Sequence, residues 1–518
     1  MSPLTYIVAW PLAAAILLLL VPRQQRVTIR ALAVLATLAT LLLALKLFWR
    51  FDSAAAGYQF VQRAAWVPAL GIQYHVGVDG LNIGLILMGA MVAFAAACVA
   101  WEIKTREKEF YILLLLMDGG ILGAFASLDL FSFYLFHELA LVPTFLMIGI
   151  WGRGERKNYA TFQITLYLSV GALLALAGLL ALYVQSGAGT FDLVDLAARL
   201  ETQPLSARDQ RFIFPLLLFG FGILVGLWPF HSWAPLGYTA APTPTAMMHA
   251  GVIKKFGLYG LLRIALPLLP QGAAAWLNVL AWLCLGNILY CGLVALRQKD
   301  LNMLIGNSSV AHMGFVFLGI ASLNVIGITG AVVVMIAHGL LAALTFAASG
   351  YIYTHTQSLN LDQFHGLLRR LPFIGTVLIM AMFAGCGLPG FANCVGELLV
   401  FFGAWKSMPL VTILAVWGGL IIGAVYMLRA IRQLLHGPVL GDAPELVDAR
   451  GPWRKLPFLL LLAALLVFGC FPRLLTDKIK PSAVRNQPSR VVAAPGDVPR
   501  SDLVRSDVPR SASRGAEE

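Results

Sequence analysis

Residues 127–152 read SLDLFSFYLFHELALVPTFLMIGIWG, an apolar run with Glu138 near its middle. A helix of about 20 apolar residues is long enough to cross the hydrocarbon core of a bilayer. A charged side chain at the centre of such a helix costs roughly 2.5–3.5 kcal/mol on insertion scales, and it usually serves a pathway for ions. The stretch therefore predicts a membrane-spanning helix at 129–151 with a functional carboxylate at mid-depth.

The composition of the whole chain indicates the same class of protein. Of the 518 residues, 59% are hydrophobic and 12% are charged, which is about half of the charged share of a soluble domain. Apolar segments of spanning length recur along the chain and predict an all-α integral membrane protein of about fourteen transmembrane helices. We expect these helices at 2–22, 27–49, 80–101, 109–127, 129–151, 159–185, 212–232, 242–266, 274–296, 300–322, 325–353, 372–404, 408–434 and 455–473.

The positive charge is distributed as in a membrane protein. The formal net charge is +12, but Lys and Arg gather in alternate loops, as at Arg153, Arg156 and Lys157. Loops rich in Lys and Arg stay in the cytoplasm, so both termini are expected on the outer, periplasmic side of the inner (plasma) membrane. No nucleic-acid partner is expected, because the charge follows the loops. The six cysteines include no C-x-x-C pair, so neither a metal site nor a disulfide is expected.

Proline and glycine interrupt two of the expected helices. The breaks are predicted at Trp228-Pro229 and 234–237 in one helix, and at 387–390 in the other, because proline removes a backbone donor and clashes with the preceding turn. Each broken helix is the fourth of a five-helix unit, in segments 109–266 and 274–434. An odd number of helices per unit predicts two inverted repeats, as in many transporters.

Two segments outside the spans have distinct compositions. Residues 191–200 (FDLVDLAARL) predict a short amphipathic helix at the outer surface. The end of the chain turns to Pro, Ser, Arg and Asp, and it contains too few apolar residues to order itself. We therefore expect a membrane domain at 1–477 and a disordered, low-complexity tail at 478–518.

Ionisable residues within the expected helices suggest proton transfer. Lys255 lies near the middle of 242–266 and Glu397 in the second half of 372–404, so that with Glu138 three separate helices carry a charge at mid-depth. Carboxylates, lysines and imidazoles can each take up and release a proton. Each also has a structural interpretation, such as an ion pair or a local hydrogen bond. Candidates with less support are His312, His338, His231 and Lys254, and after them Asp118, His137 and His249.

Two details of spacing limit these assignments. Lys254 and Lys255 are about 100° apart around a helix, so only one of them can face a given partner. Ser308 lies four residues before His312, so this histidine could simply bond within its own helix. The chain has no G-x-x-x-x-G-K loop and no G-x-S-x-G turn, and nucleotide or covalent chemistry is not expected.

Several motifs occur along the chain, namely GVDGLN (77–82), SLDLFSFYLFHELALVPTFLMIGIWG (127–152), PFHSWAP (229–235), APTPTAMMHAGVIKKFGLYGLLR (241–263), SSVAHMGF (308–315), IAHGL (336–340) and GLPGFANCVGE (387–397). Together they resemble the M-type antiporter-like subunit of respiratory complex I, a family shared with the Mrp cation/proton antiporters. The resemblance covers nearly all of residues 1–475. A carboxylate at Glu397 favours the M-type, because the L- and N-type relatives generally have lysine there.

The resemblance implies a role for each matching residue. Glu138 matches the essential glutamate of the fifth helix, Lys255 the central lysine of the eighth helix, and Glu397 the glutamate on the exit side. His312 and His338 match positions between the two half-channels, the input and output halves of the proton path. Quinone reduction elsewhere in the complex would drive this path, so the chain would contact quinone only indirectly and bind no cofactor or metal. Its partners would be the L-, N- and K-type membrane subunits.

The chain departs from the family at three places. Leu224 stands where a lysine is usual, residues 234–238 read APLGY in place of LPDAH, and Gln163 stands where a lysine is frequent. The usual Glu–Lys pair of the input half-channel is therefore incomplete. We expect a basic nitrogen within about 6 Å of the Glu138 carboxylate, supplied by His231 or else by Lys254 or His249. His249 and Lys255 would face apart unless a π-bulge separates them.

Three other functions remain open from the sequence. The chain could belong to an Mrp-type antiporter that exchanges sodium for protons, or to the membrane arm of a hydrogenase-like complex. The loss of lysine at Leu224 also allows a purely structural spacer subunit. Proteins that co-purify in mild detergent would separate these alternatives.

Overall fold

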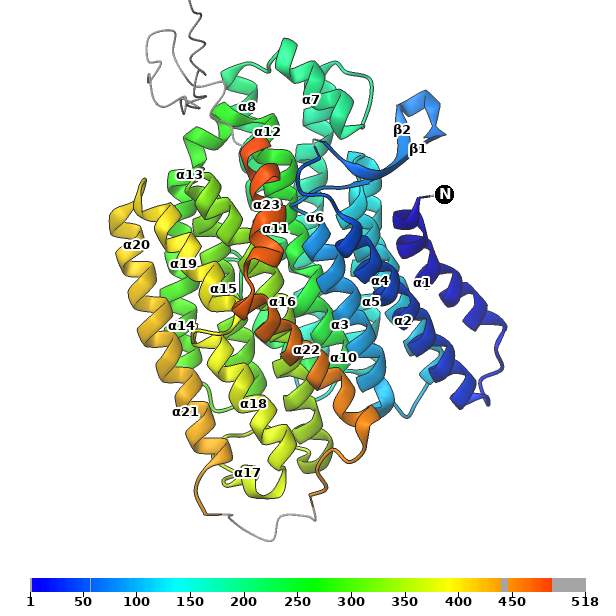
Figure 1. Cartoon of the computed structure of the whole chain (residues 1–518), viewed down its shortest axis with the longest axis vertical. Helices are drawn as coiled ribbons and strands as arrows, with labels where there is room; N and C mark the ends of the chain where they lie inside the picture. The colour runs from blue at the N-terminus through cyan, green and yellow to red at the C-terminus, as the bar shows by residue number, and fades with distance from the viewer. Residues whose placement is uncertain (1, 56, 439–445, 487–518) are drawn as a thin grey trace, which may run out of the picture.

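The computed structural model describes residues 2–55, 57–438 and 446–486, and it is built mainly of long helices that run side by side (Figure 1). In this described part, eleven helical segments are long and apolar enough to cross a membrane. The chain is therefore a multi-span membrane protein, as the sequence predicts. These segments are α1 (Pro3–Leu20), α2 (Arg26–Arg50), α3 (Ile83–Val99) with its extension to Glu102, α4 (Glu107–Ala126), α5 (Leu130–Trp151), α6 (Lys157–Ser186), α13–α14 (Pro270–Leu296), α15 (Leu301–Ala321), α16 (Val325–Thr356), α20–α21 (Pro409–Leu435) and α22 (Pro452–Cys470).

The remaining expected spans are divided into shorter helices. Span 212–232 and its continuation form α8 (Ala207–Val225) and α9 (Trp233–Ala240). Span 242–266 forms α10 (Thr243–Met248), α11 (Lys255–Gly260) and α12 (Leu266–Leu268), and span 372–404 forms α18 (Pro372–Gly385) and α19 (Ala392–Trp405). The number fourteen and the two inverted repeats stay predictions.

Both broken helices are interrupted by glycines with left-handed backbone. Gly226 follows α8 with φ 87°, and Gly387 (φ 70°) lies between α18 and α19, a conformation that costs other residues about 1–2 kcal/mol. The break expected at 234–237 is wrong, since α9 runs through these residues. Pro235 is tolerated because it lies in the first turn, where backbone N–H groups have no partner within the helix.

Among the described residues, four π-helical turns change the direction in which side chains point. They lie at His249–Ile253, Leu261–Ala265, Gly286–Tyr290 and Trp417–Ile422. The sequence predicted unbroken helices there, and it left open a π-bulge between His249 and Lys255, which the first of these turns supplies. Such turns are rare in proteins and often lie at functional sites.

The connection between α2 and α3 forms an antiparallel hairpin that the sequence did not predict. β1 (Gln59–Val67) pairs with β2 (Ile72–Val78), with Gln62 opposite Val76. The hairpin lies at the same end of the molecule as the N-terminus and α7 (Leu193–Thr202) (Figure 1). α7 is the predicted amphipathic helix, and its leucines at 193, 196 and 200 are buried.

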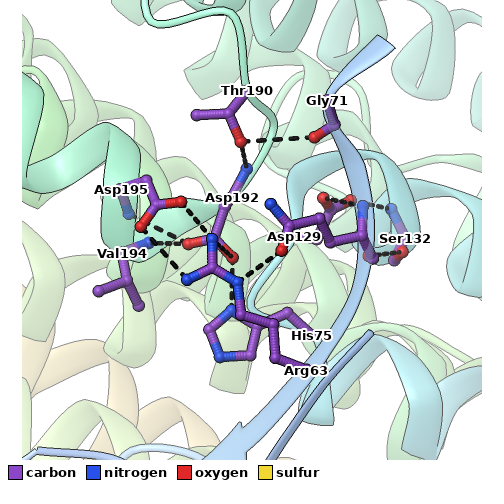
Figure 2. A network of polar contacts seen from close by, with 10 residues as sticks. Arg63, Gly71, His75, Asp129, Ser132, Thr190, Asp192, Val194 and Asp195 are labelled. Carbon is purple, nitrogen blue, oxygen red and sulfur yellow. Dashed lines mark hydrogen bonds and ion pairs between the residues drawn. The ribbon is translucent and has the colours of Figure 1, made fainter. Parts of the chain in front are cut away.

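A polar network joins the hairpin to α7 (Figure 2). Nδ1 of His75 on β2 is 2.5 Å from Oδ2 of Asp192, and the other oxygen of Asp192 accepts the N–H groups of Val194 and Asp195 at 3.0 Å. Burial alone would raise the pKa of the Asp192 carboxyl, but the hydrogen bonds from His75 and Asp195 bring it below its usual value. Arg63 on β1 pairs with Asp195. The ionised carboxylate of Asp192 therefore fixes hairpin and helix together.

Ordered helical structure continues further along the chain than the sequence predicted. α23 (Arg473–Arg485) passes the expected boundary at 477, because its residues 475, 479 and 483 form a buried apolar stripe at a spacing of four. Nη2 of Arg485 is 2.5 Å from Oδ2 of Asp79, a carboxylate that also binds Arg263. The expected disorder of 478–485 is therefore wrong. Residues 487–518, the rest of the predicted tail, lie outside the described residues.

Candidate functional site

Four of the predicted site residues form a central polar line across α11, α16, α15 and α19. Nζ of Lys255 is 2.9 Å from Nδ1 of His338, and the rings of His338 and His312 lie 5.5 Å apart. Nε2 of His312 is 3.8 Å from Oε1 of Glu397. Each of these residues is at most 4% exposed. The central polar line thus joins a lysine, two imidazoles and a carboxylate inside the helix bundle.

The π-helical turn and two glycines place Lys255 at the head of this line. Lys255 is the first residue of α11 after the turn, and its Nζ also donates to the carbonyl of Ala250 at 2.6 Å. Gly251 within the turn lies against Gly339 on α16, where a Cβ would be 3.0 Å from the Gly339 carbonyl. The close approach of the two helices brings the lysine to His338, the residue before Gly339.

Glu397 ends the line beside a small cavity. His312, Gly385, Glu397 and Tyr426 are among the residues that line it, and it has about 10 Å³ of room for the centre of a water molecule, which is about one water. Oε1 of Glu397 is buried and has no hydrogen-bond partner among the described residues. A water molecule in the cavity could therefore receive a proton from this carboxyl group.

Both ring nitrogens of His312 face oxygen acceptors. Nδ1 is 2.7 Å from the carbonyl of Ser308, and Nε2 is 3.2 Å from the carbonyl of Gly385. The hydrogen bond to residue 308 within the same helix is present, as the spacing of four residues suggested, but it involves only Nδ1, and Nε2 faces a second acceptor. Because an imidazolium donates from both nitrogens, this geometry can hold the ring while it carries an extra proton towards Glu397.

Lys254 is buried like Lys255 but has other neighbours. Its Nζ donates to Oγ of Ser309 on α15 at 3.3 Å and lies 5.6 Å from the ring centre of Tyr238 on α9. The two lysines therefore face different partners, as the 100° step predicted. Lys255, and not Lys254, contacts the central polar line.

Glu138 lies apart from the line, at the side of the bundle. Its side chain is 31% exposed, and Nδ1 of His137 is 3.5 Å from its Oε1. The ring of His137 stacks on Phe256, the residue after Lys255, with 3.8 Å between centroids. The structure therefore connects Glu138 to the central lysine through an aromatic contact and not through a continuous row of polar groups.

The residues expected to replace the missing lysine have other neighbours among the described contacts. The ring of His231 packs edge-on against Tyr290, 5.6 Å away, and Leu224 is buried. A basic nitrogen within 6 Å of the Glu138 carboxylate is supplied by its own neighbour, His137. The described ion pairs of Glu138 include none with α8 or α9, and a substituted partner at His231 stays a prediction.

Tyr426 had no signal in the sequence, because its contact with the site joins distant parts of the chain: Tyr426 on α21 bonds Ser308 at 3.0 Å across 118 residues. Gln163 on α6, which the sequence marked as a departure from the family, donates to Oγ of Ser232 in the α8–α9 break at 3.1 Å. The part of the chain that the structure describes contains no group of three or more His, Cys, Asp or Glu side chains placed to hold a metal ion.

Comparisons with known proteins agree with this architecture. The family model described as "NADH:quinone oxidoreductase/Mrp antiporter, TM" matches residues 127–423. The NADH-quinone oxidoreductase subunit M of Rhodobacter capsulatus is 35% identical over 492 residues, which cover 92% of this chain and 95% of the relative. The NAD(P)H-quinone oxidoreductase chain 4 1 of Synechococcus elongatus is 35% identical over 480 residues, which cover 92% and 89%.

Solved structures show the same fold. A chain of respiratory complex I from Thermus thermophilus with bound NADH superposes with a TM-score of 0.85 at 31% identity, and the match covers 93% of this chain and 99% of that one. A chain of the Mrp complex from Dietzia has a TM-score of 0.81 at 20% identity, covers 95% and 98%, and shows the fold alone. The fold is that of an antiporter-like membrane subunit. The chain belongs to the NADH:quinone oxidoreductase/Mrp antiporter transmembrane family.

Proposed function

We propose that the chain is a proton-translocating membrane-arm subunit of a complex I-type NADH-quinone oxidoreductase. Quinone reduction elsewhere in the complex drives proton transfer through this subunit, which itself carries out no redox step. The central polar line carries the proposal, because it places Lys255, two histidines and Glu397 within proton-transfer range inside a membrane bundle. The similarity to relatives named as subunit M and chain 4 of quinone oxidoreductases supports the assignment to this complex.

The geometry suggests an order of proton transfer. Lys255 releases its proton to Nδ1 of His338, which already lies at hydrogen-bond distance. A water molecule or a turn of one ring bridges the space between the rings of His338 and His312. His312 then passes a proton to Glu397, which releases it to water in the adjoining small cavity. Each step moves one proton and leaves the donor ready to be reprotonated.

The exposure of Glu138 supports a neighbouring membrane subunit as partner. Exposed apolar residues at 135, 142 and 146 flank Glu138 on the same side of α5, and a carboxylate facing lipid at this depth would be costly. An L-, N- or K-type subunit packed on this face would bury the carboxylate. A cationic group of that subunit would supply the positive charge that is missing here because Leu224 replaces the usual lysine.

We also propose that both termini lie on the periplasmic side of the plasma membrane. The N-terminus, the hairpin and α7 share one end of the molecule, and α17 (Leu367–Arg370) with its two arginines lies at the opposite end (Figure 1). Since loops rich in Lys and Arg stay in the cytoplasm, the end that carries α17 would be cytoplasmic. The fourteen-helix count with two inverted repeats is part of the same proposal.

Co-purification followed by reconstitution tests this function. The chain should purify in mild detergent with redox subunits, and the reconstituted complex should acidify liposomes when NADH reduces quinone. Purification with other antiporter subunits alone, together with sodium–proton exchange that does not need NADH, would support the Mrp-type alternative. Purification with hydrogenase-like subunits would support the alternative that the chain belongs to the membrane arm of a hydrogenase-like complex.

A further inference from the structure

A cleft opens near the bend at which α22 ends and α23 begins (Figure 1). It has about 510 Å³ of space, within the range of roughly 300–1,000 Å³ that is usual for pockets that bind small organic molecules. Phe471, Arg473, Asp477 and Lys478 are among the residues that line it, together with Ser53 from the segment after α2. We name it the corner cleft. Among the described residues that line it, none belongs to the central polar line.

The corner cleft lies at a boundary of the hydrocarbon core. α3 with its extension to Glu102 has 20 residues, which rise by about 30 Å, the thickness of the core. The first turn of α3 therefore marks one boundary, and a Cβ at Gly84 in this turn would be 3.5 Å from Cδ2 of Leu475 on α23. At the end of α2, Trp49 is 70% exposed, as is typical of tryptophan at a membrane surface. The cleft thus opens at the level of the lipid head groups.

Two cationic side chains in the cleft have donors available for a ligand. Arg473 is exposed and has no hydrogen bond or ion pair among the described residues. Nζ of Lys478 donates to the carbonyl of Phe51 at 3.3 Å and lies 4.9 Å from the ring centre of Phe48, but an ammonium group has three donors. Cations beside lipid are costly unless an anion pairs with them, and arginine can bind a phosphate with two parallel N–H bonds.

The start of α23 adds to this positive charge. The N–H groups at the start of a helix carry a partial positive charge, which is stabilised by an anion. The first turn of α23 has no acidic residue, and the residue that caps it, Pro472, offers no side-chain acceptor. Arg473 in this turn has the unfavourable sign for the helix dipole. A phosphate beside Arg473 would therefore stabilise both the side chain and the helix.

One carboxylate accompanies the two cations in the cleft. Asp477 lies four residues after Arg473, on the same face of α23, and it is exposed and has no ion pair in the part of the chain that the structure describes. A ligand with a phosphate alone would leave this carboxylate without a positive partner. An ammonium group a few bonds away from the phosphate would pair with it. The charges of the cleft therefore fit a head group that carries one phosphate and one ammonium group.

An apolar stripe leads away from the cleft along α22. Leu459, Ala463, Val467 and Phe471 are exposed and spaced by four residues, so they follow one face of the helix. From residue 459 to residue 471 the helix rises by about 18 Å, which is somewhat more than half of the roughly 30 Å hydrocarbon core. α22 runs from the cleft towards the end of the molecule that carries α17 (Figure 1). The stripe can therefore accompany an acyl chain into the membrane.

We propose that the corner cleft binds a phospholipid of the phosphatidylethanolamine class. The phosphate accepts N–H bonds from Arg473 and Lys478, the ammonium group donates to Asp477, and one acyl chain lies along the apolar stripe. A phosphate ion from solution would match the two cations but neither the carboxylate nor the stripe. Lipid binding at this cleft does not depend on proton transfer through the central polar line.

Photocrosslinking in the assembled complex can test this site. The complex, purified in mild detergent, is supplied with a phosphatidylethanolamine that carries a diazirine in one acyl chain, and labelling of residues 459–474 is measured by mass spectrometry. Arg473→Gln should lower this labelling at least fivefold, and Arg473→Lys should keep most of it. Lys480→Gln is the matched control, because Lys480 is also exposed on α23 but does not line the cleft. Equal labelling of Arg473→Gln and Lys480→Gln would overturn the proposal.

Competition in the wild-type complex identifies the head group without any substitution. Unlabelled phosphatidylethanolamine should suppress the labelling at a concentration at least threefold lower than phosphatidylglycerol, and this difference should vanish in Asp477→Asn. Equal competition by the two lipids in the wild type would overturn the pairing of the ammonium group with Asp477. Cys470 also lines the cleft and is exposed. A wild-type complex without labelling, in which a bifunctional thiol reagent joins Cys470 to an adjacent subunit, would show that a protein covers the cleft and would overturn the lipid site.

Discussion

Gly387→Ala should damage proton release through its contact with Glu397. A Cβ at position 387 would lie 2.8 Å from Oε2 of Glu397, so the carboxylate has to retreat to at least 3.4 Å for ordinary contact. Oε1 is already 3.8 Å from Nε2 of His312, beyond hydrogen-bond distance. A rise of about 1.4 kcal/mol in the transfer barrier slows a step tenfold. We expect a rise of this order because the carboxylate is displaced from 2.8 to 3.4 Å, and a misplacement of about 1 Å can slow a reaction about 100-fold.

Gly390→Ala is the matched control for this prediction. Gly390 also has a positive φ, 99°, but a Cβ there would meet no atom within 4 Å. Both variants should lower the inactivation temperature of the assembled complex, because both strain the backbone. Only Gly387→Ala should slow coupled NADH oxidation and proton uptake in liposomes, by about tenfold. Equal pumping by the two variants would refute the reasoning from the contact with Glu397.

Three further predictions concern other parts of the chain. Glu138→Gln should leave assembly intact and strongly reduce pumping measured with a pH-sensitive dye, and wild-type pumping would exclude a relay role. Lys255→Ala should abolish pumping because it removes the head of the central polar line, whereas Lys254→Ala should keep a larger part, and equal losses would contradict this distinction. The pKa of Asp192 is lowered in the folded protein, so its ionised carboxylate stabilises the hairpin at pH values above about 3.9, the pKa of an unfolded Asp. This stability is lost as the pH falls through the pKa of Asp192 in the folded state. Hydrogen exchange of residues 72–78 should therefore stay slow in the wild type from neutral pH to about pH 4. In Asp192→Asn it should be fast at neutral pH, because the free energy of opening the hairpin falls by about 1–3 kcal/mol. Slow exchange in that variant would exclude the role of the carboxylate.

The sequence predicted a membrane protein because many long apolar segments would leave large apolar surfaces exposed in a water-soluble fold. It also located both broken helices, since proline and glycine act on the backbone locally. The π-helical turn at His249–Ile253 contains no proline, and its Gly251 packs against Gly339 on α16, a contact between residues far apart in the chain. The hairpin at 59–78 was missed because its polar contacts to α7 join residues far apart in the chain.

The candidate site was predicted residue by residue but not in its connections. Lys255, His338, His312 and Glu397 could be selected because each is ionisable within an apolar run. Which of them touch depends on the arrangement of four helices, and no spacing in the sequence contains this information. The exposure of Glu138 could not be predicted either, because a single helix with apolar residues all round does not reveal which face meets a neighbouring subunit.

The proton yield of the Glu397→Gln complex tests the central polar line most directly. Glutamine keeps the size of the side chain but cannot accept and release a proton, whereas Glu397→Asp keeps the carboxyl group. The purified complexes should be reconstituted in liposomes, and protons translocated per NADH oxidised should be measured at matched electron-transfer rates. We expect a clear loss with glutamine and a partial recovery with aspartate. Equal proton yields for glutamine, aspartate and the wild type would contradict the role of Glu397 as the end of the proton path.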